Sequence, residues 1–380
     1  MRFFIKNLFW GGIIYEKITY VFIDLYIFFN IAFVNNSIIS NAQTTPTRSA
    51  IITANTTYLR SGRSTSDSKL KTLTKNNIVT VTGYKGNWLK VKSGTKTGYI
   101  LSKYATIMKE QTTTSSVNFR KGPNTSYSTI SKLPKNKKIY LISKSDNWSK
   151  VYCDGKIGYL SSKYTKGKYR ICIDAGHQTV GDTSKEPIAP GSSTLKYKVS
   201  YGAVGSYTKI PEYKVNLNAS KVLRNILENR GYDVIMIRDI NDIKMSNIER
   251  AQFANKNNCD LVIRIHCNSS EENNIKGATI FTPTSNNKYI SSNAYKSVCK
   301  PSYDISKLIN KKLKNKGISM FGNEIYKTSD LTGFNWSEVA CVLFEMGFIS
   351  NKTDDYNLND PAYQKKFMQG VADGIDAYYK

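Results

Sequence analysis

The sequence predicts a multidomain protein in which two small all-β barrels precede an α/β domain with a largely parallel sheet flanked by helices. Residues 58–104 align without a gap to residues 118–164, and each copy contains short alternating apolar runs broken by Gly, Asn and Ser. From residue 169 onward, apolar runs alternate with segments of helical periodicity. The first pattern is typical of small antiparallel barrels and the second of a parallel sheet.

The repeated segment predicts two domains in tandem. Matching residues lie 60 positions apart: Arg60 and Arg120, Gly62 and Gly122, Trp88 and Trp148, Gly98 and Gly158, Tyr104 and Tyr164. A period this long with two copies is typical of independent domains rather than of a solenoid. We therefore expect the β domains at 47–106 and 112–165.

Both copies resemble bacterial SH3-like domains. The resemblance rests on the "NFRKGP" opening of the second copy, on the strand that contains the tryptophan, and on the closing "GYILSKY" and "GYLSSKY". It implies that these domains bind peptidoglycan, as members of that family commonly do. The first copy departs from the pattern, with Arg63 and Ser64 where the second has Pro123 and Asn124.

The region 169–380 is predicted to form one α/β domain. Its candidate strands are "RICIDAG", "DVIMIR", "DLVIRIH", "ATIFTP" and "VACVLFE". A helix is expected within 211–231, where apolar residues recur at three- and four-residue steps. Further helices are expected within 246–258, 304–315 and 363–379. Ser246 and Glu249 have capping-box spacing at the start of the second helix.

The first 42 residues are predicted to be an export signal or an N-terminal anchor. Basic residues precede the apolar stretch 20–34, and "SNAQ" offers small residues before a cut after Ala42. Asp24 and Asn30 interrupt the stretch, which argues against the span of about 20 apolar residues that a transmembrane helix needs. The expected location is therefore secreted and associated with the cell wall.

The charge of the chain indicates a polyanionic partner. Lysine and arginine outnumber the acids by 55 to 28, so the formal net charge is +27. A charge of this size favours nucleic acid, an anionic membrane surface or an anionic cell wall. Export disfavours nucleic acid, and membrane contact is expected only if the N-terminal segment is retained. We expect a monomer that binds peptidoglycan and its associated anionic polymers.

The only two histidines occupy matching positions, since His177 follows "RICIDAG" and His266 ends "DLVIRIH". In such sheets reactive groups gather at the carboxyl ends of strands, so the two imidazoles can meet one ion. Catalytic zinc takes three protein ligands, so a third ligand is required. Glu212, which follows Pro211 after a Gly- and Ser-rich loop, is the candidate, and Glu186 within that loop is the alternative.

Glu345 closes the apolar run "VACVLFE". A carboxylate in such a position is costly unless it has a partner or a task. A metal-activated water needs a base to take its proton, and a leaving amine needs an acid to supply one. Glu345 is the candidate for both tasks.

Four segments together resemble the zinc-dependent N-acetylmuramoyl-L-alanine amidases (amidase type 3). They are "IDAGH", "PEYKVNLN", "IRIHCNSS" and "LFEMGFISN", they follow the order and spacing of that family, and the resemblance covers residues 170–380. It implies that His177, Glu212 and His266 hold one Zn²⁺ and that Glu345 is the catalytic acid/base. It also implies a catalytic domain at 169–380 that cleaves the bond between N-acetylmuramic acid and L-alanine with zinc-activated water.

Three further residues are candidate substrate contacts. Arg264 shares a strand face with His266, so it can clamp a stem-peptide carboxylate or pair with a buried acid. Asn335 and Trp336 lie in the loop 328–339, which can line the groove or be anchored by one buried tryptophan. Two other functions remain as alternatives: a non-catalytic wall-binding protein, and a zinc peptidase or deacetylase that acts on the wall.

Overall fold

The computed structural model describes residues 48–380, which lie in one compact unit that begins at Pro46. The predicted export signal or anchor therefore lies outside the described residues. Within the described part of the chain, no helix combines the length and apolar character needed to cross a membrane. All six cysteines are free and buried.

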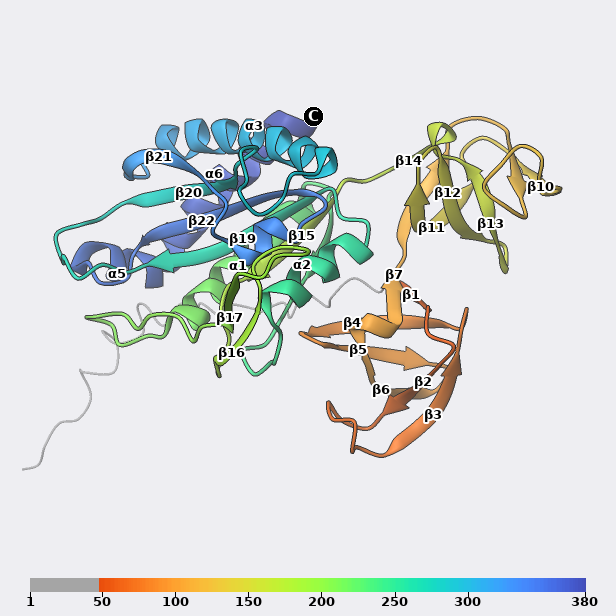
Figure 1. The fold of residues 1–380 in the computed structure, drawn as a ribbon, viewed down its shortest axis with the longest axis horizontal. Helices are drawn as coiled ribbons and strands as arrows, with labels where there is room; N and C mark the ends of the chain where they lie inside the picture. The colour runs from red at the N-terminus through yellow and green to blue at the C-terminus, as the bar shows by residue number, and fades with distance from the viewer. Residues whose placement is uncertain (1–47) are drawn as a thin grey trace, which may run out of the picture. The chain divides into compact units, whose positions relative to one another are not determined.

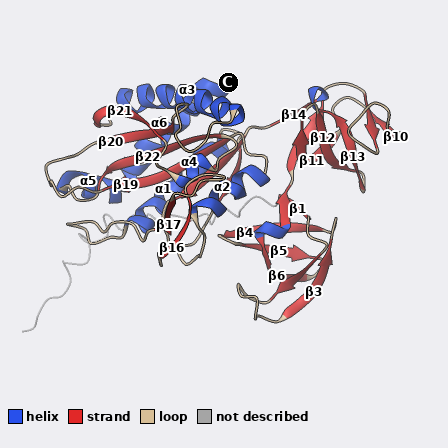
Figure 2. Ribbon diagram, viewed as in Figure 1, coloured by secondary structure: helices blue, strands red, loops and turns tan. Residues whose placement is uncertain are grey.

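The two repeats fold as antiparallel sheets with identical topology. The strand order is β3-β2-β6-β5-β4-β1-β7 in the first and β10-β9-β13-β12-β11-β8-β14 in the second. The first repeat contains β1 (Arg48–Ile52), β2 (Thr56–Arg60), β3 (Lys69–Thr74), β4 (Ile78–Lys85), β5 (Trp88–Ser93), β6 (Lys96–Leu101) and β7 (Ala105–Ile107). The second contains β8 (Lys109–Thr113), β9 (Val117–Arg120), β10 (Thr129–Leu133), β11 (Lys138–Ser145), β12 (Trp148–Cys153), β13 (Lys156–Ser161) and β14 (Thr165–Gly167). Figure 2 shows that strands dominate both repeats, which confirms the prediction of two small all-β domains.

The α/β domain is built on a six-stranded sheet in the order β18-β15-β19-β22-β20-β21 (Figure 1). Its strands are β15 (Arg170–Ala175), β18 (Asp233–Met236), β19 (Leu261–Asn268), β20 (Ala278–Pro283), β21 (Met320–Thr328) and β22 (Ala340–Phe348). Neighbouring strands are parallel except for β20 and β22. The prediction of a largely parallel sheet is confirmed, and a separate hairpin of β16 (Asp182–Pro187) and β17 (Leu195–Val199) adds two strands to the predicted loop.

Helices cover the sheet because each buries its apolar face by packing against the strands or a neighbouring helix. They are α1 (Glu212–Asn229), α2 (Asn247–Lys256), α3 (Asn293–Asn315), α4 (Thr332–Asn335), α5 (Lys352–Asn359) and α6 (Pro361–Tyr379). Helix α6 packs between α1 and α3, and both of these also contact the strands. Helix α2 begins with the predicted capping box of Ser246 and Glu249. Helix α3 begins earlier than predicted, because Ser292 caps it by accepting a bond from the Tyr295 amide.

The register of the central strands sets the position of the site. Strand β19 lies between β15 and β22, and all three run in the same direction. Their carboxyl ends therefore meet at one edge of the sheet. His266 is paired directly with Glu345 in this register, so the two side chains emerge on the same face of neighbouring strands.

The first repeat packs against the α/β domain through polar groups that neither domain satisfies alone. The buried Arg170 guanidinium donates to the Ile107 and Met108 carbonyls at 2.7 and 2.9 Å. The Ile107 amide donates to Asn257 Oδ1 at 2.7 Å. Because unpaired buried backbone groups are costly, these bonds fix the first repeat to the edge of the α/β domain.

Candidate metal centre

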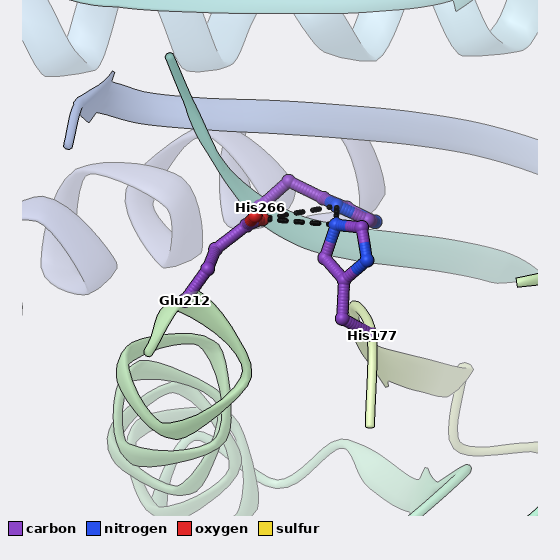
Figure 3. A group of neighbouring side chains, drawn as sticks. All are labelled: His177, Glu212 and His266. Atoms are coloured by element: carbon purple, nitrogen blue, oxygen red, sulfur yellow. Dashed lines mark hydrogen bonds and ion pairs between the residues drawn. The ribbon is translucent and has the colours of Figure 1, made fainter. Parts of the chain in front are cut away.

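The structure brings three potential metal ligands together at the carboxyl edge of the sheet. His177 Nε2 lies 3.1 Å from Glu212 Oε1, and His266 Nδ1 lies 3.4 Å from the same oxygen. The two ring nitrogens are 3.0 Å apart, and the ligand atoms of the group all lie within 4.8 Å of one another. Figure 3 shows the three side chains converging from a strand end, a helix start and a neighbouring strand.

The local backbone presents His177 to the other two residues. His177 follows strand β15 with a left-handed φ of 59°, which turns the chain sharply after Gly176. A Cβ atom at Gly176 would lie 2.3 Å from the His266 ring, so only glycine allows the two rings to approach. Nδ1 of His177 lies 2.9 Å from the Ser200 carbonyl, which can only accept. This bond assigns the ring hydrogen to Nδ1 and leaves the Nε2 lone pair free for a cation.

Burial keeps His266 in the neutral form that a metal requires. The enclosed position lowers the pKa of His266 to about 4. Its Nδ1 atom faces His177 and Glu212, whereas its Nε2 atom is buried without a hydrogen-bond partner among the described residues. A neutral imidazole whose Nδ1 lone pair is directed at the other two residues is a suitable zinc ligand.

Glu212 is a buried carboxylate held in one orientation. Its Oε1 atom accepts from the Cys267 amide and the Asn216 side chain at 3.0 and 3.1 Å, and its Oε2 atom accepts from the Ala203 amide at 3.0 Å. Burial alone would raise the pKa of Glu212, but the interactions of its carboxylate with the two histidine side chains, hydrogen bonding first, outweigh it and hold that pKa well below its usual range. The carboxylate is therefore a fixed negative charge that faces two imidazoles.

The donor set fits a zinc ion. Two imidazole nitrogens and one carboxylate oxygen are the ligands of many catalytic zinc sites, which keep a fourth position open for water or substrate. The buried carboxylate also needs a compensating positive charge, because a buried anion is otherwise strongly disfavoured. These three residues can hold a metal, and the assignment of zinc stays a prediction.

Glu345 lies beside this group on strand β22. Its Oε2 atom is buried and has no hydrogen-bond partner among the residues that the structure describes. Burial raises the pKa of Glu345 well above its usual range, the charge of Glu212 raises it further, and Arg264 opposes both. A raised pKa suits a carboxyl group to the transfer of a proton to a leaving group.

Arg264 pairs with a buried acid. Its Nε atom donates to Asp174 Oδ2 at 2.9 Å and its Nη2 atom donates to Asn247 Oδ1 at 2.9 Å. Both Arg264 and Asp174 are buried. The structure thus has the second of the two arrangements that the sequence left open, and a contact of Arg264 with substrate stays a prediction.

The structure also places the other candidate contacts. The buried Asn335 donates to the Ile188 carbonyl at 3.1 Å, and Trp336 Nε1 donates to the Pro187 carbonyl at 3.0 Å. Both residues therefore fasten the end of strand β16, and their contact with substrate stays a prediction. Glu186, the alternative third ligand, accepts from the Ile248 amide at 3.1 Å and lies outside the metal-ligand group.

Three residues that support the site were not singled out from the sequence as site residues. Arg250 donates to Asp174 Oδ1 at 2.6 Å and to the His177 carbonyl at 3.1 Å. Arg238, which is fully buried, donates to the Gly176 carbonyl at 2.9 Å. The acid inside the apolar "RICIDAG" run was an available signal for Asp174. Arg238 offers no local signal, because its partners are backbone carbonyls far away in the sequence.

Comparison with known proteins identifies the families to which the domains of this chain belong. Residues 171–377 match the family described as N-acetylmuramoyl-L-alanine amidase, and residues 55–106 and 115–166 each match the bacterial SH3 domain. The chain therefore belongs to the N-acetylmuramoyl-L-alanine amidase family, and it contains two bacterial SH3 domains.

Individual relatives span most of the described chain or its α/β domain. A Staphylococcus aureus protein named "Probable cell wall amidase LytH" is 24% identical over 278 residues, covering 70% of this chain and 84% of its own length. A Staphylococcus epidermidis protein of the same name is 24% identical over 286 residues, with the same coverage. Among solved structures, the apo amidase Ami1 of Mycobacterium abscessus superposes with a TM-score of 0.50 at 23% identity, covering 56% of this chain and 99% of that chain. This last similarity supports the fold.

Proposed function

We propose that this protein is a zinc-dependent peptidoglycan hydrolase that cleaves the amide bond between N-acetylmuramic acid and the L-alanine of the stem peptide. The observation that carries the proposal is the convergence of His177, Glu212 and His266 within 4.8 Å in a chain of the amidase family. Zinc bound there would polarise the scissile carbonyl and lower the pKa of a water to about 7.

The residues of the chain would orient the metal ligands and transfer the proton. The Ser200 carbonyl keeps Nε2 of His177 unprotonated, and the three donors to Glu212 keep its carboxylate aimed at the rings. In its ionised form, Glu345 accepts a proton from the attacking water as the new C–O bond forms. It then gives this proton to the alanine nitrogen as the C–N bond breaks, which leaves a free amine and the lactyl carboxylate.

The surroundings of the site support action on the cell wall. The two bacterial SH3 domains belong to a family that commonly binds peptidoglycan. The net charge of +27 favours association with an anionic matrix. Relatives named as cell wall amidases point to the same place of action. We propose that the protein is secreted, remains at the wall and works as a monomer.

The test is a joint measurement of metal and product on residues 46–380, which form the compact unit. We expect one zinc per chain by elemental analysis, and mass spectrometry of digested peptidoglycan should reveal free stem peptides that begin with L-alanine. A chelator should abolish both. Zinc with a different cleavage product would replace the amidase by a peptidase or deacetylase. No zinc and no product after zinc loading would leave a wall-binding protein without catalysis.

A further inference from the structure

A second pocket lies away from the metal centre, where both SH3 repeats meet helix α2. Its volume is about 420 Å³. We call it the junction pocket. It is lined by Ile51, Ile52, Thr53, Lys75, Asn76, Thr106, Ile142, Ser143, Lys144, Lys150, Asn255, Lys256 and Asn258. None of the metal-ligand group contributes to it, so the junction pocket is a separate feature of the same compact unit.

Specific contacts build the walls of the junction pocket. Ile51 of the first repeat packs with Met108 and Ile142 in a small apolar cluster between the repeats. Asn258, just beyond α2, donates to the Ile142 carbonyl at 3.0 Å. Lys256 Nζ donates to Thr53 Oγ1 at 3.3 Å. The pocket therefore depends on all three parts of the molecule and would not exist in an isolated repeat.

The charge of the junction pocket is of one sign. Four lysines line it and no acid does: Lys75, Lys144, Lys150 and Lys256. Across the described chain, no ion pair with an Asp or Glu involves any of the four. Like charges gathered without counterions repel one another, and an anion placed among them removes this repulsion.

Among the four lysines, Lys256 has a partly buried ammonium group whose hydrogen-bond partners are all uncharged. Its ammonium group is partly buried and donates to the Lys103 carbonyl and the Thr53 hydroxyl, both of which are uncharged. Burial lowers the pKa of Lys256 to about 8. A partly desolvated charge gains stability from an anionic partner, because the attraction is stronger where water is excluded.

The lining favours phosphate over a single carboxylate. Side chains of asparagine, serine and threonine line the same pocket, and the hydroxyl and amide groups among them that are not bonded elsewhere can donate to the oxygens of a tetrahedral anion. Lysine binds phosphate as a point charge without demanding the planar geometry that pairs arginine with a carboxylate. Four cations around one pocket also suit a polymer with several negative charges better than a ligand with a single charge.

We propose that the junction pocket binds a phosphate-bearing polymer of the cell wall, so that the enzyme is held by a phosphodiester chain as well as by its substrate. The site is not a general property of the SH3 repeat. Lys144 and Ser143 correspond to Tyr84 and Gly83 of the first repeat, so the first repeat lacks this lysine. The proposal relies on the proposed function only for the location at the wall.

The test compares two triple variants that lose the same charge. Lys75→Ala/Lys144→Ala/Lys150→Ala removes three lining lysines that make no side-chain hydrogen bond within the described chain. Lys121→Ala/Lys132→Ala/Lys135→Ala removes three exposed lysines of the second repeat that do not line the pocket. Affinity for purified poly(glycerol phosphate) is measured by calorimetry at two salt concentrations, with polyglutamate as the carboxylate polymer.

The pocket variant should bind poly(glycerol phosphate) about 100-fold more weakly, a factor of about five per lysine, and with less dependence on salt. The control variant should remain within about threefold of the unaltered chain, and polyglutamate should bind more weakly than the phosphate polymer. Equal losses in both variants would mean diffuse attraction and would overturn the site. Equal binding of polyglutamate, with equal sensitivity to the pocket variant, would overturn the choice of phosphate.

Amidase activity provides an independent check. Cleavage of a small soluble muramoyl peptide should be the same in the unaltered chain and in the pocket variant, because no lining residue belongs to the metal centre. Walls stripped of phosphate polymers should be bound equally by both. A chain that binds poly(glycerol phosphate) in the pocket but cleaves nothing would refute the proposed function and leave the junction pocket intact.

Discussion

The two SH3 repeats share one topology but differ in what the turn between β4 and β5, or between β11 and β12, contacts. In the first repeat, the Tyr84 amide donates to Asp239 Oδ2 at 3.1 Å and Lys85 Nζ donates to Asp239 Oδ1 at 2.8 Å. The equivalent positions of the second repeat are Lys144 and Ser145, which are exposed. The duplicated domain has thus kept its fold, while this turn pairs with the α/β domain in the first copy and carries exposed side chains that form no ion pair with any described residue in the second.

The docked face of the first repeat combines apolar contacts with charged pairs. Arg48 reaches Asp233 at 2.9 Å, and Arg170 reaches the other oxygen of Asp233 at 2.7 Å. The second repeat adds one such contact, because Lys109 at the start of β8 pairs with Asp260 at 2.6 Å. Buried charge pairs fix orientation more than they add stability, so the interface sets how the first repeat is held. The comparison therefore predicts that the interface is specific and easily broken by single changes.

The largest expected effect is a loss of turnover that leaves the binding functions of both repeats intact. In Glu345→Gln, turnover should fall by about 10²- to 10⁴-fold, because the proton transfer assigned to this carboxyl is lost. Zinc content and peptidoglycan binding should be unchanged. The measurement is product release at saturating substrate, alongside elemental analysis. Appreciable turnover in this variant would remove Glu345 from its proposed role.

The next effect tests whether the first repeat is structurally part of the enzyme. Arg170→Met should lower the free energy of unfolding by about 3–5 kcal/mol, since it breaks a buried ion pair and leaves backbone carbonyls unsatisfied. Denaturant unfolding followed by tryptophan fluorescence measures it. The matched change is Arg120→Met, whose guanidinium bonds the Tyr127 carbonyl at an exposed position within the second repeat. If both variants lost the same stability, the two repeats would not differ in the way that the structure indicates.

A smaller effect is expected at the hairpin turn of the first repeat. Asp239→Ala should cost about 1–3 kcal/mol of unfolding free energy, because the Tyr84 amide loses its acceptor and Lys85 loses its partner. Asp154→Asn removes an exposed ion pair with Lys137 in the second repeat, keeps a residue type that tolerates the left-handed φ of 47° there, and should have no measurable effect on unfolding. A loss in the second variant as large as in the first would contradict the contrast between docked and free faces.

The smallest effect is a dependence of docking on pH. Burial acts to raise the pKa of Asp233, but Arg170 and Arg48 outweigh it and lower that pKa below the ordinary value. A carboxyl with a lowered folded-state pKa stabilises fully above its unfolded-state pKa of about 4, and this contribution is lost as the pH falls through the lowered value. Unfolding free energy measured from about pH 6 downward should therefore drop in the acid range. The decrease should be smaller in Asp233→Asn, and an identical pH profile would exclude this carboxyl as the cause.

Local patterns predicted the parts of the fold that depend on local physics. The alternating runs of the repeats, the helical face of α1 and the capping box at Ser246 each depend on neighbours within a few residues. The positions of His177 and His266 at strand ends follow from apolar runs of the right length. These features specify two β domains, an α/β domain and the meeting of the two histidines.

Other features depend on partners that are distant in the sequence. The hairpin of β16 and β17 was predicted as a loop, because it is fastened by Trp336 and by the start of α2 rather than by its own apolar pattern. The antiparallel pairing of β20 with β22 has no local signature. The buried pairing of Arg264 with Asp174 could be stated only as one of two alternatives, since side-chain partners across strands require the register.

The bonds between Ile107 and the α/β domain have a consequence for the order of folding during synthesis. Domains generally fold from the amino terminus as the chain emerges. The second repeat has all its strands once residue 167 is made. The first repeat is synthesised earlier, yet the hydrogen bonds of the Ile107 carbonyl and amide can form only after Arg170 and Asn257 have been synthesised. The first repeat therefore completes its strands early but reaches its final contacts late, and a nascent chain that ends between residues 170 and 257 lacks the Asn257 partner of the Ile107 amide.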